Sequence, residues 1–177
     1  MTLITVSILN ELIGPKITLM PNQVLEKLSF HLKRALGRGN RLRDTVELAL
    51  LFFDKHKNKV YYAGANLPMY FVRNGKLEEI KPDKYPVADV YREHQTFSLK
   101  TIELRADDAI FLSTDGFYSQ FGGPDNKKYS RKRFRQLLLS LAEMDFTDAS
   151  HRIEREFFHW KQANDQTDDV LVLGLKI

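Results

Sequence analysis

The stretch from Ala109 to Gly116 places the tightest limit on what this chain can fold into. Its first part, Ala109 to Ser113, is an uncharged run that follows Asp107-Asp108 and leads through Thr114 to Asp115 and Gly116. An apolar run with such boundaries predicts a buried β-strand that carries Asp115 to the end of a sheet. The chain therefore needs a sheet with enough covering structure to bury this strand.

A second acidic pair, Asp168-Asp169, stands directly before another apolar run that begins at Val170. If the two strands lie side by side and antiparallel, the end of the first adjoins the start of the second, and Asp115 then meets Asp168. Neighbouring carboxylates repel each other, and a shared proton or a bound cation relieves the repulsion. We therefore predict a site for a hard divalent cation. A simpler interpretation also stays open, because Asp-Gly and Asp-Asp are common turn signals.

The composition is that of an ordinary globular protein. The chain has 177 residues, of which 43% are hydrophobic and 28% charged, and we interpret it as a single domain over residues 1–177. The absence of cysteine excludes disulfides and thiolate metal sites and leads us to expect a cytoplasmic protein. No apolar run reaches the about 20 residues of a membrane helix. The opening residues lack the basic leading segment of a secretory signal.

Lysine and arginine are concentrated at residues 127–135, in one segment of a chain whose net charge is +4. The apolar residues of that segment recur at helical spacing from Phe134 to Leu141, so its cations are interpreted as the solvated face of a helix. Three cations in the first turn oppose the helix dipole, which also indicates an acidic or phosphorylated partner. Nucleic acid is not expected, because Phe134 is better placed in the core than between exposed cations. The candidate partner-binding residues are Arg131, Lys132, Arg133 and Arg135.

Apolar spacing predicts helices towards both ends of the chain. Residues 2–13 are expected to form a mostly buried helix with Val6, Leu9 and Ile13 on one apolar stripe and Ile8 and Leu12 beside it. Pro21 opens a second helix that ends before Gly37. Later in the chain, two helices are expected to be capped by Ser130 and by Thr147, and the first of these runs to about Met144. The inward face of the last helix is expected to contain Ala149, Ile153, Phe157 and Trp160.

Between these helices, turn signals and strand-like composition predict a mostly antiparallel sheet, and hence an α+β fold with helices covering the sheet. Asn74-Gly75 is the strongest hairpin signal in the chain. Phe121 to Pro124 is interpreted as a glycine-rich loop. The expected strands are residues 45–53, 59–65, 69–73, 76–80, 97–104, 109–113 and 170–177.

The order of five short motifs resembles the SpoIIE/RsbU-like branch of the type 2C metal-dependent (PPM) protein serine/threonine phosphatases. The resemblance extends from about Leu3 to Ile177. It implies a β-sandwich, that is, two stacked sheets with flanking helices. The motifs are Ala63–Pro68, Asn74-Gly75, Ser113–Gly116, Phe121–Gly123 and Gln166–Val170.

The same resemblance implies a chemistry. In that family two Mn²⁺ or Mg²⁺ ions lie between the sheets, and a water that bridges them attacks phosphoserine or phosphothreonine directly. By motif, Asp115 and Asp168 would be metal ligands, and Asp169 an outer or alternate ligand. Gly116, Asp44 and Asn66 would lie near the site, with Asn66 fixing its loop. The implied substrate is a phosphorylated bacterial signalling regulator, similar to an anti-sigma-factor antagonist.

The chain departs from the family pattern at its beginning. Family members carry an aspartate that bridges both metals and a Gly-His-Gly motif, whereas this chain contains no Gly-His-Gly and Met1 aligns just downstream of that segment. We therefore expect an N-terminally truncated domain that binds metal weakly, because ligand charge sets the affinity for hard cations. Open sheet edges would also favour a homodimer. The alternative is a non-catalytic module that keeps the phosphatase fold and binds a partner.

Overall fold

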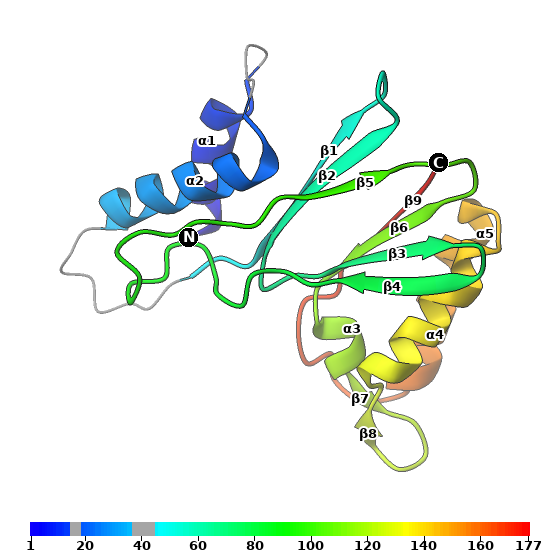
Figure 1. Ribbon diagram of the computed structural model, residues 1–177. Helices are drawn as coiled ribbons and strands as arrows, with labels where there is room; N and C mark the ends of the chain where they lie inside the picture. Colours follow the sequence, from blue (N-terminus) through cyan, green and yellow to red (C-terminus); the bar gives the residue numbers. More distant parts are fainter. Residues whose placement is uncertain (15–18, 37–44) are drawn as a thin grey trace. The chain divides into compact units, whose positions relative to one another are not determined.

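The computed structural model describes residues 1–14, 19–36 and 45–177, apart from the side chain of Leu36. These residues form two compact units. The first unit comprises Met1–Pro68 and Lys81–Leu104, and the second comprises Met69–Ile80 and Arg105–Ile177. Each unit has its own sheet and its own helices (Figure 1).

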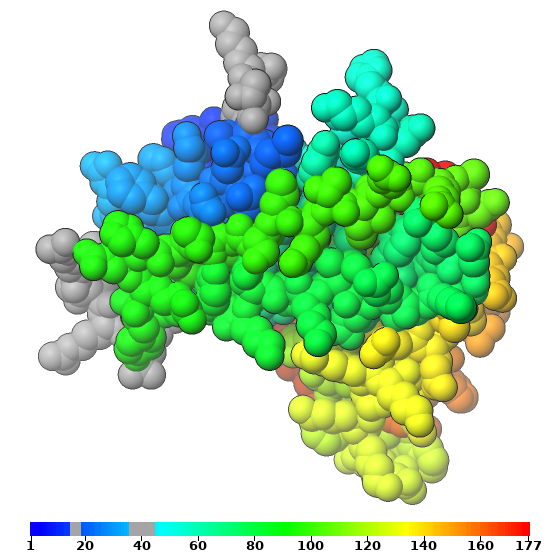
Figure 2. All heavy atoms as spheres, in the orientation of Figure 1, coloured from blue at the N-terminus to red at the C-terminus, as the bar shows by residue number. Residues whose placement is uncertain are grey.

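The first unit contains a three-stranded antiparallel sheet in the order β1-β2-β5. Strands β1 and β2 form a hairpin whose turn is closed by Asp54, because its Oδ1 accepts hydrogen bonds from the backbone N of His56 and of Lys57, each at 3.1 Å. The tip of this hairpin projects from the surface as the cyan atoms in Figure 2. The elements of this unit are α1 (Thr2–Leu12), α2 (Pro21–Leu36), β1 (Leu48–Asp54), β2 (Lys59–Ala65) and β5 (Lys100–Glu103).

Helix α2 covers the sheet of the first unit, as its spacing predicts. Leu25, Leu28 and Leu32 are fully buried and pack with Ala63 and Ala65 of β2. The start of the helix is also supported, since Gln23 Oε1 accepts a hydrogen bond from Met20 N at 2.9 Å. The core of this unit is therefore made mainly of aliphatic side chains.

Helix α1 forms where it is predicted, but only part of its predicted inward face packs and the helix is not mostly buried. Leu9 packs against the core of the first unit together with Ile8 and Leu12, whereas Val6 and Ile13 are 48% and 45% exposed. The one buried residue of the helix is Thr5. Apolar residues occupy nearly every side of this helix, so their spacing does not indicate which side packs.

The second unit contains a four-stranded antiparallel sheet in the order β4-β3-β6-β9. The β3–β4 hairpin turns at Asn74 and Gly75, whose φ angles of 50° and 69° are those that a tight two-residue hairpin turn requires. Its boundaries are those the sequence predicts. The strands of this sheet are β3 (Met69–Arg73), β4 (Lys76–Ile80), β6 (Ala109–Ser113) and β9 (Val172–Lys176).

Three helices follow β6, namely α3 (Gly116–Ser119), α4 (Arg131–Ala142) and α5 (Phe146–Lys161). Ser130 caps α4 as predicted, and its Oγ accepts a hydrogen bond from Arg133 N at 3.5 Å. The cap of α5 is Asp145 rather than the predicted Thr147, because Asp145 Oδ1 accepts a hydrogen bond from Thr147 N at 2.8 Å. The predicted glycine-rich loop is instead a short hairpin, with strands β7 (Phe121–Gly122) and β8 (Lys127–Lys128).

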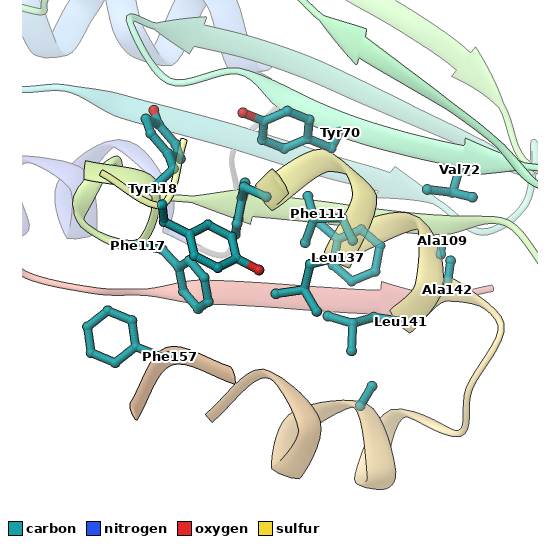
Figure 3. Close-up of a cluster of buried hydrophobic side chains, with 14 residues drawn as sticks. Tyr70, Val72, Ala109, Phe111, Phe117, Tyr118, Leu137, Leu141, Ala142 and Phe157 are labelled. Atoms are coloured by element: carbon teal, nitrogen blue, oxygen red, sulfur yellow. The ribbon is translucent and has the colours of Figure 1, made fainter. Parts of the chain in front are cut away.

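Aromatic side chains dominate the core of the second unit, between the sheet and helices α4 and α5 (Figure 3). Phe134 is fully buried, and its ring lies 5.1 Å from that of Phe117 and 5.8 Å from that of Tyr70. Phe117 also contacts the rings of Tyr129 and Phe157. Helix α3 is thereby fixed against α4 and α5.

The antiparallel sheets with flanking helices confirm the predicted α+β class. In the part of the chain that the structure describes, no helix is long and apolar enough to cross a membrane. The homodimer expected from an open sheet edge stays a prediction.

Candidate active site

Strands β6 and β9 pair antiparallel, which confirms the arrangement predicted from the two acidic motifs. Their register runs from Ala109 opposite Lys176 to Ser113 opposite Val172. The pairing continues beyond the strands, because Thr114 N donates a hydrogen bond to Leu171 O at 3.1 Å. The backbone that follows β6 therefore runs alongside the backbone that precedes β9.

Thr114 fixes the acidic segment to the end of β6 through its side chain. Its Oγ1 donates a hydrogen bond to Asp169 O at 2.9 Å and accepts one from Leu171 N at 3.0 Å. A single hydroxyl thus holds the chain on both sides of Val170. The threonine is part of the Ser113–Gly116 motif, and this contact gives it a physical role.

Gly116 lies directly against Asp169, and this contact requires a residue without a side chain. A Cβ atom placed on Gly116 would lie 2.4 Å from the backbone oxygen of Asp169 and 3.2 Å from a methyl carbon of Val170. Since real Cβ atoms do not approach backbone so closely, any larger residue would push Asp169 away from α3. The glycine keeps Asp115 and Asp169 on adjoining pieces of chain.

The three predicted metal ligands are all exposed. Asp115 stands at the N-cap position of α3, and its Oδ2 accepts a hydrogen bond from Ser119 Oγ at 3.4 Å. Asp168 Oδ1 accepts one from the backbone N of Asp169 at 2.7 Å. Exposed carboxylates on adjoining segments are suited to a hard cation, although an exposed turn has the same appearance.

The metal ions that the family binds need several ligands close together, and this requirement is a stricter test of Asp115, Asp168 and Asp169. Among the residues that the structure describes, no group of three or more histidine, aspartate or glutamate side chains is placed to hold a metal ion. The acidic residues at the β6–β9 end therefore offer suitable oxygen ligands without a complete ligand set. The assignment of Asp115, Asp168 and Asp169 as metal ligands stays a prediction.

For two other residues, Asp44 and Asn66, the predicted place near the site stays a prediction. Asp44 lies outside the described residues. Asn66 belongs to the first unit, where it has a φ of 62° and donates a hydrogen bond from Nδ2 to Glu47 Oε1 at 2.9 Å. Its backbone N also donates to Asp83 O at 3.0 Å. These contacts hold Asn66 in the loop that follows β2.

Gln120 is a residue of this region that sequence reasoning missed. Its side chain is fully buried at the end of α3. Nε2 donates to Asp165 O at 2.9 Å, and Oε1 accepts a hydrogen bond from Thr167 N at 3.1 Å. Gln120 therefore ties the loop that carries Asp168 to α3. A glutamine between a helix and a glycine pair has no pattern that would predict this role.

The cations predicted as a partner-binding face surround the start of α4. Arg135 pairs with Glu79, with Nη1 at 3.8 Å from Oε2. The Arg131 guanidinium lies 5.1 Å from the centre of the Tyr118 ring, and that of Arg133 lies 4.5 Å from Trp160. All four residues, including Lys132, are exposed. They form the wet face of the helix, as the spacing predicts, and their role in binding a partner stays a prediction.

Comparisons with known proteins identify relatives of this chain. A family model described as "Stage II sporulation protein E (SpoIIE)" matches residues 1–177. No curated protein sequence matches significantly. The SiaA-PP2C domain of Pseudomonas aeruginosa has a similar structure, with a TM-score of 0.88 at 19% identity, over 99% of this chain and 68% of that one.

Two further solved structures are similar. One contains the RsbU and RsbW domains of Rv1364c from Mycobacterium tuberculosis, with a TM-score of 0.73 at 19% identity, over 97% of this chain and 45% of that one. The other is the catalytic domain of the serine threonine protein phosphatase PstP in complex with two manganese ions, with a TM-score of 0.65 at 15% identity, over 97% of this chain and 77% of that one.

At these identities the structural matches establish the fold, and the family follows from the match along the whole sequence. This chain belongs to the SpoIIE family, and it has the fold of type 2C (PPM) protein phosphatase domains.

Proposed function

We propose that this chain is a protein serine/threonine phosphatase domain that acts on a phosphorylated signalling regulator of bacteria. The observation that carries the proposal is the antiparallel pairing of β6 with β9, which sets Gly116 against the backbone of Asp169. Asp115 and Asp168-Asp169 are the acidic residues that a type 2C phosphatase would use here. The membership of the chain in the SpoIIE family supports the same reaction.

In the proposed reaction water breaks the phosphorus–oxygen bond of phosphoserine or phosphothreonine, which releases inorganic phosphate and the free hydroxyl. Bound divalent ions supply the activation of water in enzymes of this type, and the PstP structure contains two manganese ions. The described residues of this chain do not offer a complete ligand set for such ions. We therefore expect weak binding of Mn²⁺ or Mg²⁺ and slow turnover by this chain alone.

The incomplete ligand set among the described residues also supports a second candidate function. A chain that keeps the phosphatase fold without a full metal centre would act as a non-catalytic module that binds a regulator. The exposed cations at the start of α4 would then be its contact surface. The two candidates differ in one measurable property, because only the phosphatase releases phosphate in proportion to bound metal.

Hydrolysis of a chromogenic phosphate ester distinguishes the candidates. The initial rate is measured as Mn²⁺ is added, for the chain and for the variant Asp115→Asn, and calorimetry gives the affinity for Mn²⁺. Asp125→Asn is the matched control, because Asp125 is an exposed aspartate of the β7–β8 turn. We expect a slow rate that rises with Mn²⁺, falls by about tenfold or more in Asp115→Asn and is unchanged in the control.

Two results would contradict this proposal in different ways. A rate equal to that of Asp115→Asn at every Mn²⁺ concentration would exclude the phosphatase and favour the non-catalytic module. Tight binding of two ions with rapid turnover would show that the ligand set is complete in the folded chain, and the expectation of weak binding would be wrong.

A further inference from the structure

A strongly basic surface lies where the β7–β8 hairpin meets the first turn of α4. We call it the basic corner and define it as Lys127, Lys128, Arg131, Lys132 and Arg133, all of which are exposed. Figure 2 shows the hairpin and the start of α4 at the surface, as the yellow-green and yellow atoms. Between Phe121 and Arg135 the sequence contains a single acidic residue, Asp125.

The charges of the basic corner are largely not neutralised within the protein. Lys127 Nζ lies 3.1 Å from Asp125 Oδ2, and this pair is exposed to solvent. For the other four cations, no carboxylate oxygen among the described residues lies within the 4.0 Å of an ion pair. Exposed pairs contribute little free energy, so the pairing of Lys127 with Asp125 competes only weakly with an anionic partner.

Aromatic rings hold three of these cations in place instead of carboxylates. Lys128 lies 5.6 Å from the centre of the Phe121 ring, and Arg131 and Arg133 lie over Tyr118 and Trp160. A cation on a ring is oriented without losing its charge. The corner is therefore preorganised, which lowers the entropy lost when an anionic partner binds.

The arrangement has a cost that an anionic partner would relieve. The first turn of α4 contains Arg131, Lys132 and Arg133 and no acidic residue. Cations at this end oppose the helix dipole, and like charges so close together also repel each other. An acidic partner would offset both effects.

The basic corner is joined to the candidate active site through α3. Ser130 N donates a hydrogen bond to Tyr118 O at 3.0 Å, and Tyr129 N donates to Gln120 O at 2.9 Å. Helix α3 begins directly after Asp115, and Ser119 N donates to Asp115 O at 2.9 Å. One short helix therefore links the cations to the residue proposed for the reaction.

From these observations we propose that the basic corner binds an acidic stretch of the substrate protein next to its phosphorylated residue. This proposal rests on the proposed phosphatase function and adds the substrate class, namely a phosphoserine or phosphothreonine flanked by glutamate or aspartate. A protein partner is favoured over nucleic acid because the rings of Phe121, Tyr118 and Trp160 already carry the chain's own cations, whereas single-stranded nucleic acid needs free aromatic faces.

Binding of a synthetic peptide tests the proposal independently of catalysis. The probe is a fluorescein-labelled peptide with one phosphoserine next to a run of glutamates, and its anisotropy is measured in EDTA so that no metal-dependent hydrolysis occurs. The test variant is Lys128→Glu with Lys132→Glu. The matched control is Arg152→Glu with Arg155→Glu, which makes the same charge change at exposed positions of α5.

We expect the test variant to bind the peptide about tenfold or more weakly and the control to bind within about twofold of the unchanged chain. A version of the peptide with alanines in place of glutamates should bind weakly to every variant. Equal loss in test variant and control, or equal binding of the alanine peptide, would overturn the proposal. Tighter binding of a single-stranded DNA oligonucleotide with the same number of negative charges would also overturn it. Absence of phosphatase activity leaves this measurement unaffected, so the two proposals fail separately.

Discussion

The helix pairs of the two units are built in different ways. Helices α4 and α5 of the second unit both have side-chain caps, and the aromatic rings around Phe134 lock them onto their sheet. In the first unit α1 has no side-chain cap, and Leu3 on its surface is 86% exposed. The comparison shows that apolar spacing alone does not determine how a helix packs on its sheet. Side-chain caps and interlocking aromatic rings also fix the helix in place.

The largest expected loss of stability comes from removing the ring of Phe134, at the centre of the core of the second unit. Phe134→Ala should lower the free energy of unfolding by about 4 kcal/mol, because it leaves a cavity among three other rings. Urea denaturation followed by the fluorescence of Trp160 would measure it. The matched control is Phe30→Ala in α2, where the side chain is 57% exposed and the expected loss is below about 0.5 kcal/mol. Equal losses would show that the ring cluster does not stabilise the second unit.

A buried ion pair of the second unit provides the next largest effect. Arg73 donates two hydrogen bonds to Asp108, at 2.8 Å and 2.6 Å, and Arg105 N donates a third at 2.7 Å. Burial alone would raise the pKa of Asp108, but these hydrogen bonds outweigh it and hold the pKa below its ordinary value. Asp108→Asn should lower the free energy of unfolding by about 3 kcal/mol at neutral pH.

The effect of Asp108→Asn should also depend on pH in one direction. Because the pKa of Asp108 is lowered by folding, its contribution to stability is present above the unfolded value of about 3.9 and is lost as pH falls through the folded value. The difference between the chain and the variant should therefore shrink in acid. The exposed neighbour provides the control Asp107→Asn, for which denaturation curves at neutral pH should show a difference below about 0.5 kcal/mol. A difference for Asp108→Asn that grows in acid would contradict the assigned pKa shift.

A smaller loss of stability is expected for a substitution of Gln120, which holds the loop that carries Asp168 of the candidate site. Gln120→Leu removes the hydrogen bonds to Asp165 O and from Thr167 N and should cost about 2 kcal/mol. Hydrogen exchange at the amide of Thr167 should become faster than in the rest of the unit. The control Gln136→Leu changes an exposed glutamine of α4 and should leave that exchange unchanged. Protection of Thr167 that survives Gln120→Leu would show that the loop is held by other contacts.

The smallest effect is expected on α1. Leu3→Ser should change the free energy of unfolding by less than about 0.5 kcal/mol, because Leu3 is 86% exposed. Leu12→Ser, on the side of α1 that packs against the core, should cost several times more, and urea denaturation would compare the two. A larger loss for Leu3→Ser would mean that the outward face of α1 is covered in solution, as the predicted homodimer would require.

The parts of the fold that were predicted well depend on local signals. Asn74-Gly75 defines the β3–β4 hairpin because few other residue pairs adopt positive φ readily, and Ser130 marks the start of α4. The predicted cap of α5 is wrong because Asp145 and Thr147 are both good capping residues. Only the extended backbone of Asp145, with φ −62° and ψ 139°, decides between them.

The candidate site was predictable only in part. The pairing of β6 with β9 followed from two acidic boundaries on two apolar runs, and the register confirms it. The roles of Thr114 and Gln120 could not be predicted, because each depends on a hydrogen bond to a residue far along the chain. The β7–β8 hairpin was missed because each of its strands has two residues, too few for an alternating pattern.

We propose that the end of β6 and the start of β9 together form one cation site. Adding Mn²⁺ to the isotopically labelled chain and following the broadening of its amide signals by nuclear magnetic resonance tests this most directly. We expect the signals of Gly116 and Asp169 to broaden together at the lowest Mn²⁺ concentration, and Asp115→Asn to weaken both effects. Broadening that begins at other exposed carboxylates, or that reaches Gly116 and Asp169 at different concentrations, would contradict it.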